Sequence, residues 1–321
     1  MKKWVSMIVM GVLFIGAAAG FLLMGRIGSP ASSGTGREVT DRTGVSMQIP
    51  AHPKRVVILN PSQVDLYCAA GGAGTIVGKP TTHSFSADTE AAVRSAEEVG
   101  MIHQPNQEKI LALHPDLVIG VNVPYHQQLR ESLAKAGIPL YINVLDSYQD
   151  VLDTLTFFGE LTGNQEQAEK SIKKLQSDHE QAVQKTQGHN SPRAVILFQT
   201  PQGSSAATRH SFAGDLMQQM GGQNLADQAG SAEAAFVPLS TEYIIRQNPE
   251  VIFIISMGNT EEQLKNFTDS LSSDPVWNGT DAVKNHRVFV LPNELFTVNP
   301  GMRMGEAMKT MAEALYPREE D

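Results

Sequence analysis

Two stretches of the chain, NQEKILALHPDLVIG at residues 106–120 and STEYIIRQNPEVIFI at residues 240–254, carry the same pattern. In each, a glutamate is followed seven residues later by a proline, then by an acidic residue and a run of apolar residues. This order predicts a helix that stops near the proline and leads into a buried strand of a parallel sheet. Because the unit recurs in both halves, we expect two similar α/β lobes, and a cleft between lobes is a common ligand site.

Apolar strands and helical segments alternate around both copies of this pattern. The predicted strands are 55–60, 75–80, 116–122 and 139–144 in the first half, and 193–199, 251–256 and 287–291 in the second. Between the halves, residues 164–187 predict one long helix with a polar face. The sequence therefore predicts two Rossmann-like lobes with parallel sheets, joined by a long rigid helix, with the ligand cleft between them. The expected organisation is an N-terminal segment and tether (1–36), a first lobe (37–163), the interlobe helix (164–188) and a second lobe (189–321).

Composition excludes several classes of protein. The formal net charge of −9 and the lack of a basic stripe argue against a nucleic-acid partner. One cysteine, Cys68, rules out a disulfide framework or a cysteine zinc site within one chain, and we expect it to be a buried core thiol. The sequence holds no GxSxG, HExxH, P-loop or strand-linked GxGxxG motif, so we expect a binding protein and not an enzyme.

The N-terminus indicates export. Lys2 and Lys3 precede an almost unbroken apolar run from residue 4 to residue 24, which is typical of a signal sequence or a membrane anchor. Positive charge before the run directs the rest of the chain outward. We expect the protein on the outer face of the cytoplasmic membrane, held by this segment, or secreted if the chain is cleaved near Ala31.

Four phrases of the chain together resemble the substrate-binding proteins of ATP-driven importers for metal chelates, namely siderophores, haem and cobalamin. They are HPKRVVILN (52–60), the segment 98–120, HSFAGDLMQQMGGQN (210–224) and the second copy of the repeat. The resemblance implies two lobes bridged by one helix, a monomer, and the permease subunits of an importer as partners. It also implies that Glu108 and Glu242, one in each copy of the repeat, dock onto those subunits. The alternative is that each carboxylate only stabilises the start of its own helix.

Three further stretches are similar to the haem receptors of this family: VGMIHQPNQEK (99–109), ISMGNTEEQLKNF (255–267) and DAVKNHRVFVLPNELF (281–296). In those receptors the loop of the first lobe supplies a methionine to the haem iron, and the loop of the second lobe supplies a histidine. Here His103 stands at the first position and Met257 at the second, so the pair is exchanged. The resemblance implies that His103 and Met257 are the axial ligands of transported haem b, received from an upstream haem donor protein. Histidine and methionine together are a sound axial pair for haem iron.

The haem propionates need hydrogen-bond donors. We expect Ser62 to cap a helix whose start, at Ser62 and Gln63, offers free backbone N–H groups. The resemblance places His83 near the propionates, and His210 could face the cleft from the second lobe. For all four residues a capping or surface role is an equally good interpretation.

Two rival ligands stay open at this point. A ferric siderophore or a corrinoid would suit the same family, although strand-end loops hold few lysines or arginines and only two tryptophans occur in the chain. A metal ion held by His83, His103, His126 or His210 is the other rival, and their scatter along the chain weakens it.

Overall fold

The computed structural model describes residues 36–229, 233–238, 241–258 and 260–317. The chain divides into two units, 1–34 and 35–321, and everything described below belongs to the second. The predicted apolar segment 4–24 lies outside the described residues. Within those residues, no helix has the length and apolar character needed to cross a membrane.

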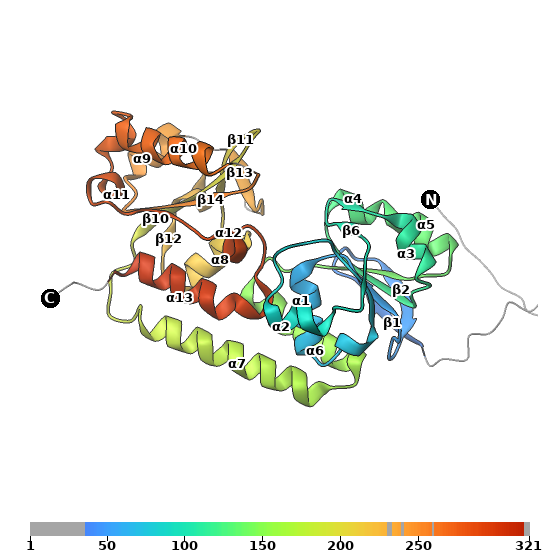
Figure 1. Ribbon diagram of the computed structural model, residues 1–321. Helices are drawn as coiled ribbons and strands as arrows, with labels where there is room; N and C mark the ends of the chain where they lie inside the picture. Colours follow the sequence, from blue (N-terminus) through green and yellow to red (C-terminus); the bar gives the residue numbers. More distant parts are fainter. Residues whose placement is uncertain (1–35, 230–232, 239–240, 259, 318–321) are drawn as a thin grey trace, which may run out of the picture. The chain divides into compact units, whose positions relative to one another are not determined.

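The first lobe is built on a parallel sheet, as the sequence predicts (Figure 1). Its strand order is β5–β4–β3–β8–β9, with every neighbouring pair parallel. The strands are β3 (Val56–Ile58), β4 (Ile76–Lys79), β5 (Glu97–Glu98), β8 (Leu117–Val121) and β9 (Leu140–Asn143). Its helices are α1 (Pro61–Ala69), η1 (Ala73–Thr75), α2 (Ala87–Ala92), α3 (Gln107–Ala112), α4 (Pro124–Gln127) and α5 (Leu129–Lys135). Two antiparallel hairpins complete it: β1 (Gly36–Thr40) with β2 (Ser46–Pro50), and β6 (Gly100–Met101) with β7 (Gln104–Pro105).

The second lobe has a parallel centre and an antiparallel edge. β10 (Arg193–Thr200), β14 (Val251–Ser256) and β15 (Val288–Val290) are parallel neighbours, and β12 (Gln223–Asn224) also pairs with β10. On the other side β11 (Gly203–Ala207) and β13 (Phe236–Pro238) run antiparallel, an edge that the sequence does not predict. Its helices are α8 (Phe212–Gln219), η2 (Leu225–Gln228), α9 (Thr241–Gln247), α10 (Glu261–Ser273), η3 (Trp277–Gly279), α11 (Asp281–Lys284), α12 (Asn293–Phe296), η4 (Gly301–Arg303) and α13 (Met304–Leu315).

Two consecutive helices connect the lobes. α6 (Tyr148–Thr162) begins with a capping box between Ser147 and Asp150 and ends at Gly163, whose φ of 73° only glycine adopts without strain. α7 (Gln165–Gln184) follows and packs against α6 and α1 at one end and against α13 at the other (Figure 1). The long bridging helix predicted from the sequence is therefore present as α7.

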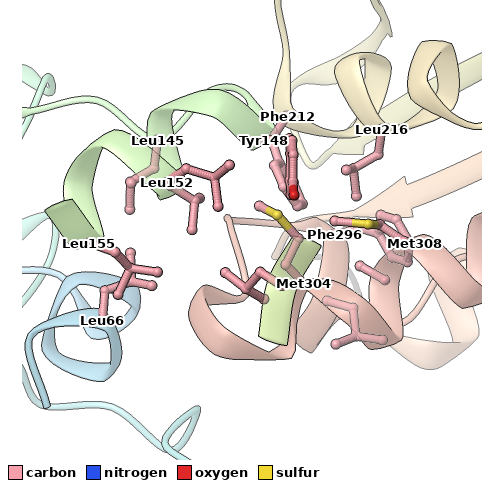
Figure 2. Packing of buried hydrophobic residues seen from close by; sticks show 14 of the residues in the cluster. Leu66, Leu145, Tyr148, Leu152, Leu155, Phe212, Leu216, Phe296, Met304 and Met308 are labelled. Carbon is pink, nitrogen blue, oxygen red and sulfur yellow. The ribbon is translucent and has the colours of Figure 1, made fainter. Parts of the chain in front are cut away.

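A continuous apolar core runs from the first lobe into the second. Figure 2 shows Leu66 of α1 and Leu155 of α6 in the same cluster as Phe212 of α8 and Met304 of α13. All four belong to the buried core. Because buried apolar contacts are close-packed and stiff, this shared core limits how far the lobes can move independently.

A segment of the second lobe also hydrogen-bonds to the first. The backbone N–H of Met302 donates to Asp65 of α1 at 2.6 Å, and Asn299 Nδ2 donates to the Leu145 carbonyl at 3.2 Å. The Ser62 hydroxyl donates to the Asn299 carbonyl. We call residues 299–302 the strap, because they tie the end of the second lobe onto α1.

The repeated sequence pattern corresponds to a repeated set of hydrogen bonds. In the first lobe, Arg55 Nε donates to the carbonyls of Leu113 and His114 at 3.1 and 3.2 Å, which closes the end of α3. The acidic residue of the pattern, Asp116, accepts from the N–H of Arg55 at 3.0 Å. His114 has a φ of 45°, the left-handed conformation that turns the chain from the helix toward its strand.

The second lobe repeats each of these contacts. Arg193 Nε donates to the carbonyls of Gln247 and Asn248 at 3.2 and 3.1 Å, and Glu250 accepts from the N–H of Arg193 at 2.8 Å. Asn248 has a φ of 50°. The acid after each proline therefore anchors the start of the neighbouring strand, and an arginine there holds the end of the glutamate-bearing helix.

The predicted cap of α1 was wrong by two residues. Asn60 is the N-cap, and its Oδ1 accepts from the N–H of Gln63 at 3.1 Å. Pro61 occupies the first turn, where its missing N–H costs nothing. Ser62 lies inside the helix, so the N–H of Gln63 is used by the cap and is not free.

Candidate functional site

A cavity of about 360 Å³ lies between the two lobes and is lined by both. It meets the carboxyl ends of the parallel strands of each sheet: Asn60 follows β3, Asn122 follows β8, and Phe198 and Ile255 belong to the ends of β10 and β14. Ligands of open α/β sheets bind at this end of the strands. The volume falls within the range of small-molecule sites, which identifies the cavity as the candidate binding site.

The wall from the second lobe is aromatic. Phe198, Phe212, Phe236 and Phe296 all line the cavity. Phe212 and Phe296 are buried, whereas Phe236 is 46% exposed. The rings of Phe198 and Phe236 lie 4.9 Å apart with a tilt of 54°, a favourable geometry for an aromatic pair.

The wall from the first lobe combines polar side chains with the apolar residues Val121, Val123, Val144 and Leu145. Asn60, Asn122, Asn143 and Asp146 line it. Burial raises the pKa of the Asp146 carboxyl, and the nearby charge of Asp150 raises it further. No lysine, arginine or histidine occurs among the described residues that line this cavity. The site therefore offers amides and one carboxyl group, with no cationic side chain.

His103 belongs to the first lobe and is not among the residues that line the cavity. It sits in the turn between β6 and β7, is exposed, and its ring lies 6.5 Å from the ring of Tyr125 at an angle of 68°. Tyr125 comes two residues after Val123, which lines the cavity. His126 holds this loop to β8, because its Nδ1 accepts from the N–H of Val121 at 3.0 Å. Burial lowers the pKa of His126, which favours the neutral imidazole that accepts this hydrogen bond.

Met257 directly follows β14 of the second lobe and is not among the residues that line the cavity. It comes two residues after the lining residue Ile255, is 41% exposed, and its N–H donates to the Gln199 carbonyl at 2.9 Å. Gly258 follows with a φ of 77°. Because its side chain is partly exposed, Met257 contributes less to the core than most methionines do. Its thioether sulfur is a soft ligand of the kind that binds haem iron.

Of the other four predicted cleft residues, the structure places only one in the lining of the cavity. Ser62 lines the cavity. Gln63 does not, because its buried side chain donates to the Gly120 carbonyl at 3.2 Å. His83 and His210 are exposed, and neither is among the residues that line the cavity.

Comparison with known families decides the class of the protein. The sequence model of the periplasmic binding protein family matches residues 56–295. This chain belongs to the periplasmic binding protein family.

Two curated relatives place this periplasmic binding protein more closely. It is 27% identical over 286 residues to the uncharacterized ABC transporter substrate-binding lipoprotein YvrC of Bacillus subtilis, covering 87% of this chain and 85% of YvrC. It is 25% identical over 250 residues to the high-affinity heme uptake system protein IsdE of Staphylococcus aureus, covering 75% of this chain and 80% of IsdE. These relatives confirm the resemblance to importer substrate-binding proteins that the sequence indicates, to IsdE in particular, and they are binding proteins and not enzymes.

Solved structures share the fold of this periplasmic binding protein. IsdE complexed with heme superposes with a TM-score of 0.70 at 23% identity, covering 82% of this chain and 98% of IsdE. The vitamin B12 binding protein BtuF of Vibrio cholerae superposes with a TM-score of 0.66 at 19% identity, covering 82% and 96%. These superpositions confirm the two-lobe α/β fold. They do not decide the ligand of this chain, because the two proteins bind different metal chelates.

The glutamates of the repeat occupy equivalent places in the two lobes of this binding protein. Glu108 is in the first turn of α3 and Glu242 is in the first turn of α9, and both are exposed. Neither carboxylate takes part in an ion pair within the described part of the chain. Both are therefore available to a partner as well as to the helix dipole.

Cysteine and ionisable clusters add no second site to this binding protein. Cys68 is half-buried against the core, and burial raises the pKa of its thiol to about 12, which keeps it unreactive. In the described ranges, no group of three or more histidine, cysteine, aspartate or glutamate side chains could hold a metal ion. The rival interpretation of a receptor for a bare metal ion therefore has no site there.

Proposed function

We propose that this protein is an extracytoplasmic haem receptor that delivers haem b to an ABC-type importer for iron acquisition. His103 from the first lobe and Met257 from the second would each bind one face of the haem iron. The observation that carries the proposal is their placement. Both side chains are exposed: the ring of His103 lies 6.5 Å from that of Tyr125, two residues after the lining residue Val123, and Met257 comes two residues after the lining residue Ile255 of the other lobe.

The ligand chemistry supports iron in a porphyrin. A neutral imidazole and a thioether suit haem iron, and a histidine–methionine pair raises its potential relative to two nitrogen ligands. The 25% identity to the heme uptake protein IsdE points to the same cargo. The exposed rings of Phe236 and Tyr125, one from each lobe, suit a flat apolar ligand.

The cavity disfavours a ferric siderophore. Catecholate and carboxylate chelates of iron are anionic, and the described residues that line the cavity include no cation to neutralise them. A corrinoid is the second candidate, since its peripheral amide groups would match the amides of Asn60, Asn122 and Asn143. The shared fold with the vitamin B12 binder BtuF is compatible with this candidate.

Delivery requires a membrane partner. We propose that Glu108 and Glu242 dock the two lobes onto the permease subunits, where exposed charges give orientation and association rate more than affinity. The receptor would act as a monomer that takes haem from a donor protein. Its N-terminal segment would keep it on the outer face of the cytoplasmic membrane, or would be removed on secretion.

Absorbance of the purified protein incubated with haemin tests the cargo and its ligands together. We expect a Soret band with the wild type, and a shifted band with at least about tenfold weaker binding in His103→Ala and in Met257→Ala. His189→Ala, which removes an exposed histidine in the turn after α7, is the matched control and should leave the band unchanged.

Two outcomes would contradict the proposal. If both His103→Ala and Met257→Ala keep the wild-type spectrum, the axial assignment fails. If haemin produces no bound spectrum while cobalamin does, the corrinoid candidate replaces haem.

A further inference from the structure

The two walls of the cavity differ in chemistry, and the difference follows the division between the lobes. The aromatic residues Phe198, Phe212, Phe236 and Phe296 come from the second lobe, whereas the carboxyl group and three of the four lining asparagines come from the first; the fourth, Asn299, belongs to the strap. A cavity whose aromatic side chains come from one lobe and most of whose amides come from the other favours one orientation of a ligand that has both kinds of surface.

We infer that the second lobe binds the ring of the macrocycle on Phe198 and Phe236, while the first lobe binds its polar arms through Asn60 and Asn122. This assignment rests on the proposed function and extends it, because it names the residues that select a planar ligand with polar substituents. It involves neither of the proposed iron ligands.

Phe236 has the features of a ligand platform. It lies on the edge strand β13, lines the cavity and is 46% exposed. Covering this exposed ring surface with an apolar ligand would be favourable, because it removes apolar area from water. Phe198 supports it from β10 at 4.9 Å. Phe212 and Phe296, which line the same cavity, are 8% and 3% exposed and therefore give the wall a rigid base. A flat ligand placed on this wall would cover the exposed ring.

Asn122 has the features of a side chain that hydrogen-bonds to a polar substituent of the ligand. Its side chain is exposed at the cavity, and its Oδ1 accepts from Gln127 Nε2 at 2.6 Å. That bond uses the oxygen and leaves Nδ2 without a hydrogen-bond partner in the part of the chain that the structure describes. Asn60 is held in the same way, since its Oδ1 accepts from the N–H of Gln63. Each amide thus keeps a donor for a carboxylate or carbonyl of the ligand.

The test uses metal-free protoporphyrin and its dimethyl ester, because neither needs an axial ligand. Binding is measured by quenching of porphyrin fluorescence. We expect Phe236→Ala to weaken both ligands by about tenfold, since the lost stacking and burial act on the ring that they share. We expect Asn122→Ala to weaken the free acid by about fivefold and the ester by less than twofold, because only the acid offers a charged acceptor.

Matched variants keep the result interpretable. Val276→Ala truncates another exposed apolar residue of the second lobe, 51% exposed and outside the cavity lining, and should change neither affinity. Phe236→Leu keeps an apolar side chain and should fall between wild type and Phe236→Ala. Circular dichroism of each variant confirms that the fold is retained.

The outcomes separate this inference from the proposed function. If the wild type binds protoporphyrin, and Phe236→Ala and Phe236→Leu bind it within twofold of the wild-type affinity, then the ring of Phe236 does not bind the macrocycle. That result overturns the role of the aromatic wall and nothing else. Equal losses for acid and ester in Asn122→Ala overturn the role of the amide. Wild type that binds haemin but neither porphyrin overturns this inference and leaves the proposed function in place, whereas wild type that does not bind haemin overturns the proposed function itself.

Discussion

Removing the carboxylate of Asp65 should loosen the strap and destabilise the whole protein. Asp65 Oδ2 accepts from the N–H of Met302 at 2.6 Å, and Oδ1 accepts from the hydroxyl of buried Thr89 at 2.6 Å. A hydrogen bond to a charged group contributes about 1.5–3 kcal/mol. Because Asp65 is half-buried and water can replace part of each bond, we take the lower value for both and expect Asp65→Ala to cost about 3 kcal/mol.

Urea denaturation measures this loss, and hydrogen exchange locates it. We expect a single unfolding transition, since one core joins the lobes, and faster exchange of the Met302 amide in the variant. Asp65→Asn keeps one acceptor and should lose about half as much stability. Asp269→Ala removes an exposed carboxylate paired with Lys265 and should cost no more than about 0.5 kcal/mol. A loss below about 0.5 kcal/mol in Asp65→Ala, with Met302 still protected, would refute the reasoning.

Two further predictions concern the docking glutamates and the cysteine. Glu108→Ala combined with Glu242→Ala should retain haemin binding and lose uptake by cells that carry the importer, because both carboxylates lie away from the described cavity lining; intact uptake would contradict docking. The pKa of the Cys68 thiol is raised from 9.0 to about 12 by burial and then by the charge of Asp65, so the thiol stabilises the fold fully below pH 9. Above pH 9 the unfolded thiol ionises first, and the contribution falls by about 1.4 kcal/mol per pH unit until pH 12. Between pH 8 and pH 10 the wild type should therefore lose about 1.4 kcal/mol more than Cys68→Ala in urea titrations, and equal losses would disprove the shift.

The central strands could be predicted from the sequence because their apolar runs are buried on both faces. VIFIIS is buried along its whole length in β14, and Leu117–Gly120 is equally buried in β8. The antiparallel edge of the second sheet could not be predicted. β11 has the sequence GSSAA, which has no strand propensity of its own and is extended because it pairs with β10. β13 has only three residues, and its place depends on β11.

The candidate site divides in the same way. His103 and Met257 could be proposed from the sequence because they stand in stretches that resemble the haem receptors of the family, at the positions whose counterparts bind iron there. The aromatic wall could not, since Phe198 and Phe236 are brought together by the unpredicted edge of the second sheet. One available signal was missed at α1: a proline at residue 61 marks the first helical position, which makes Asn60 the cap.

The matched arginine bonds at Arg55 and Arg193 have a consequence for any partner built from two identical subunits. Both arginines hold the ends of helices that have an exposed glutamate in their first turn. The two lobes of one chain therefore each expose a glutamate on a helix that is fixed in the same way. One chain therefore carries the same local arrangement of helix, arginine and acid in each of its two lobes. Two identical subunits of a membrane complex could then each bind one lobe through similar contacts. A substitution that disrupts the contact of one lobe would leave the contact of the other lobe intact.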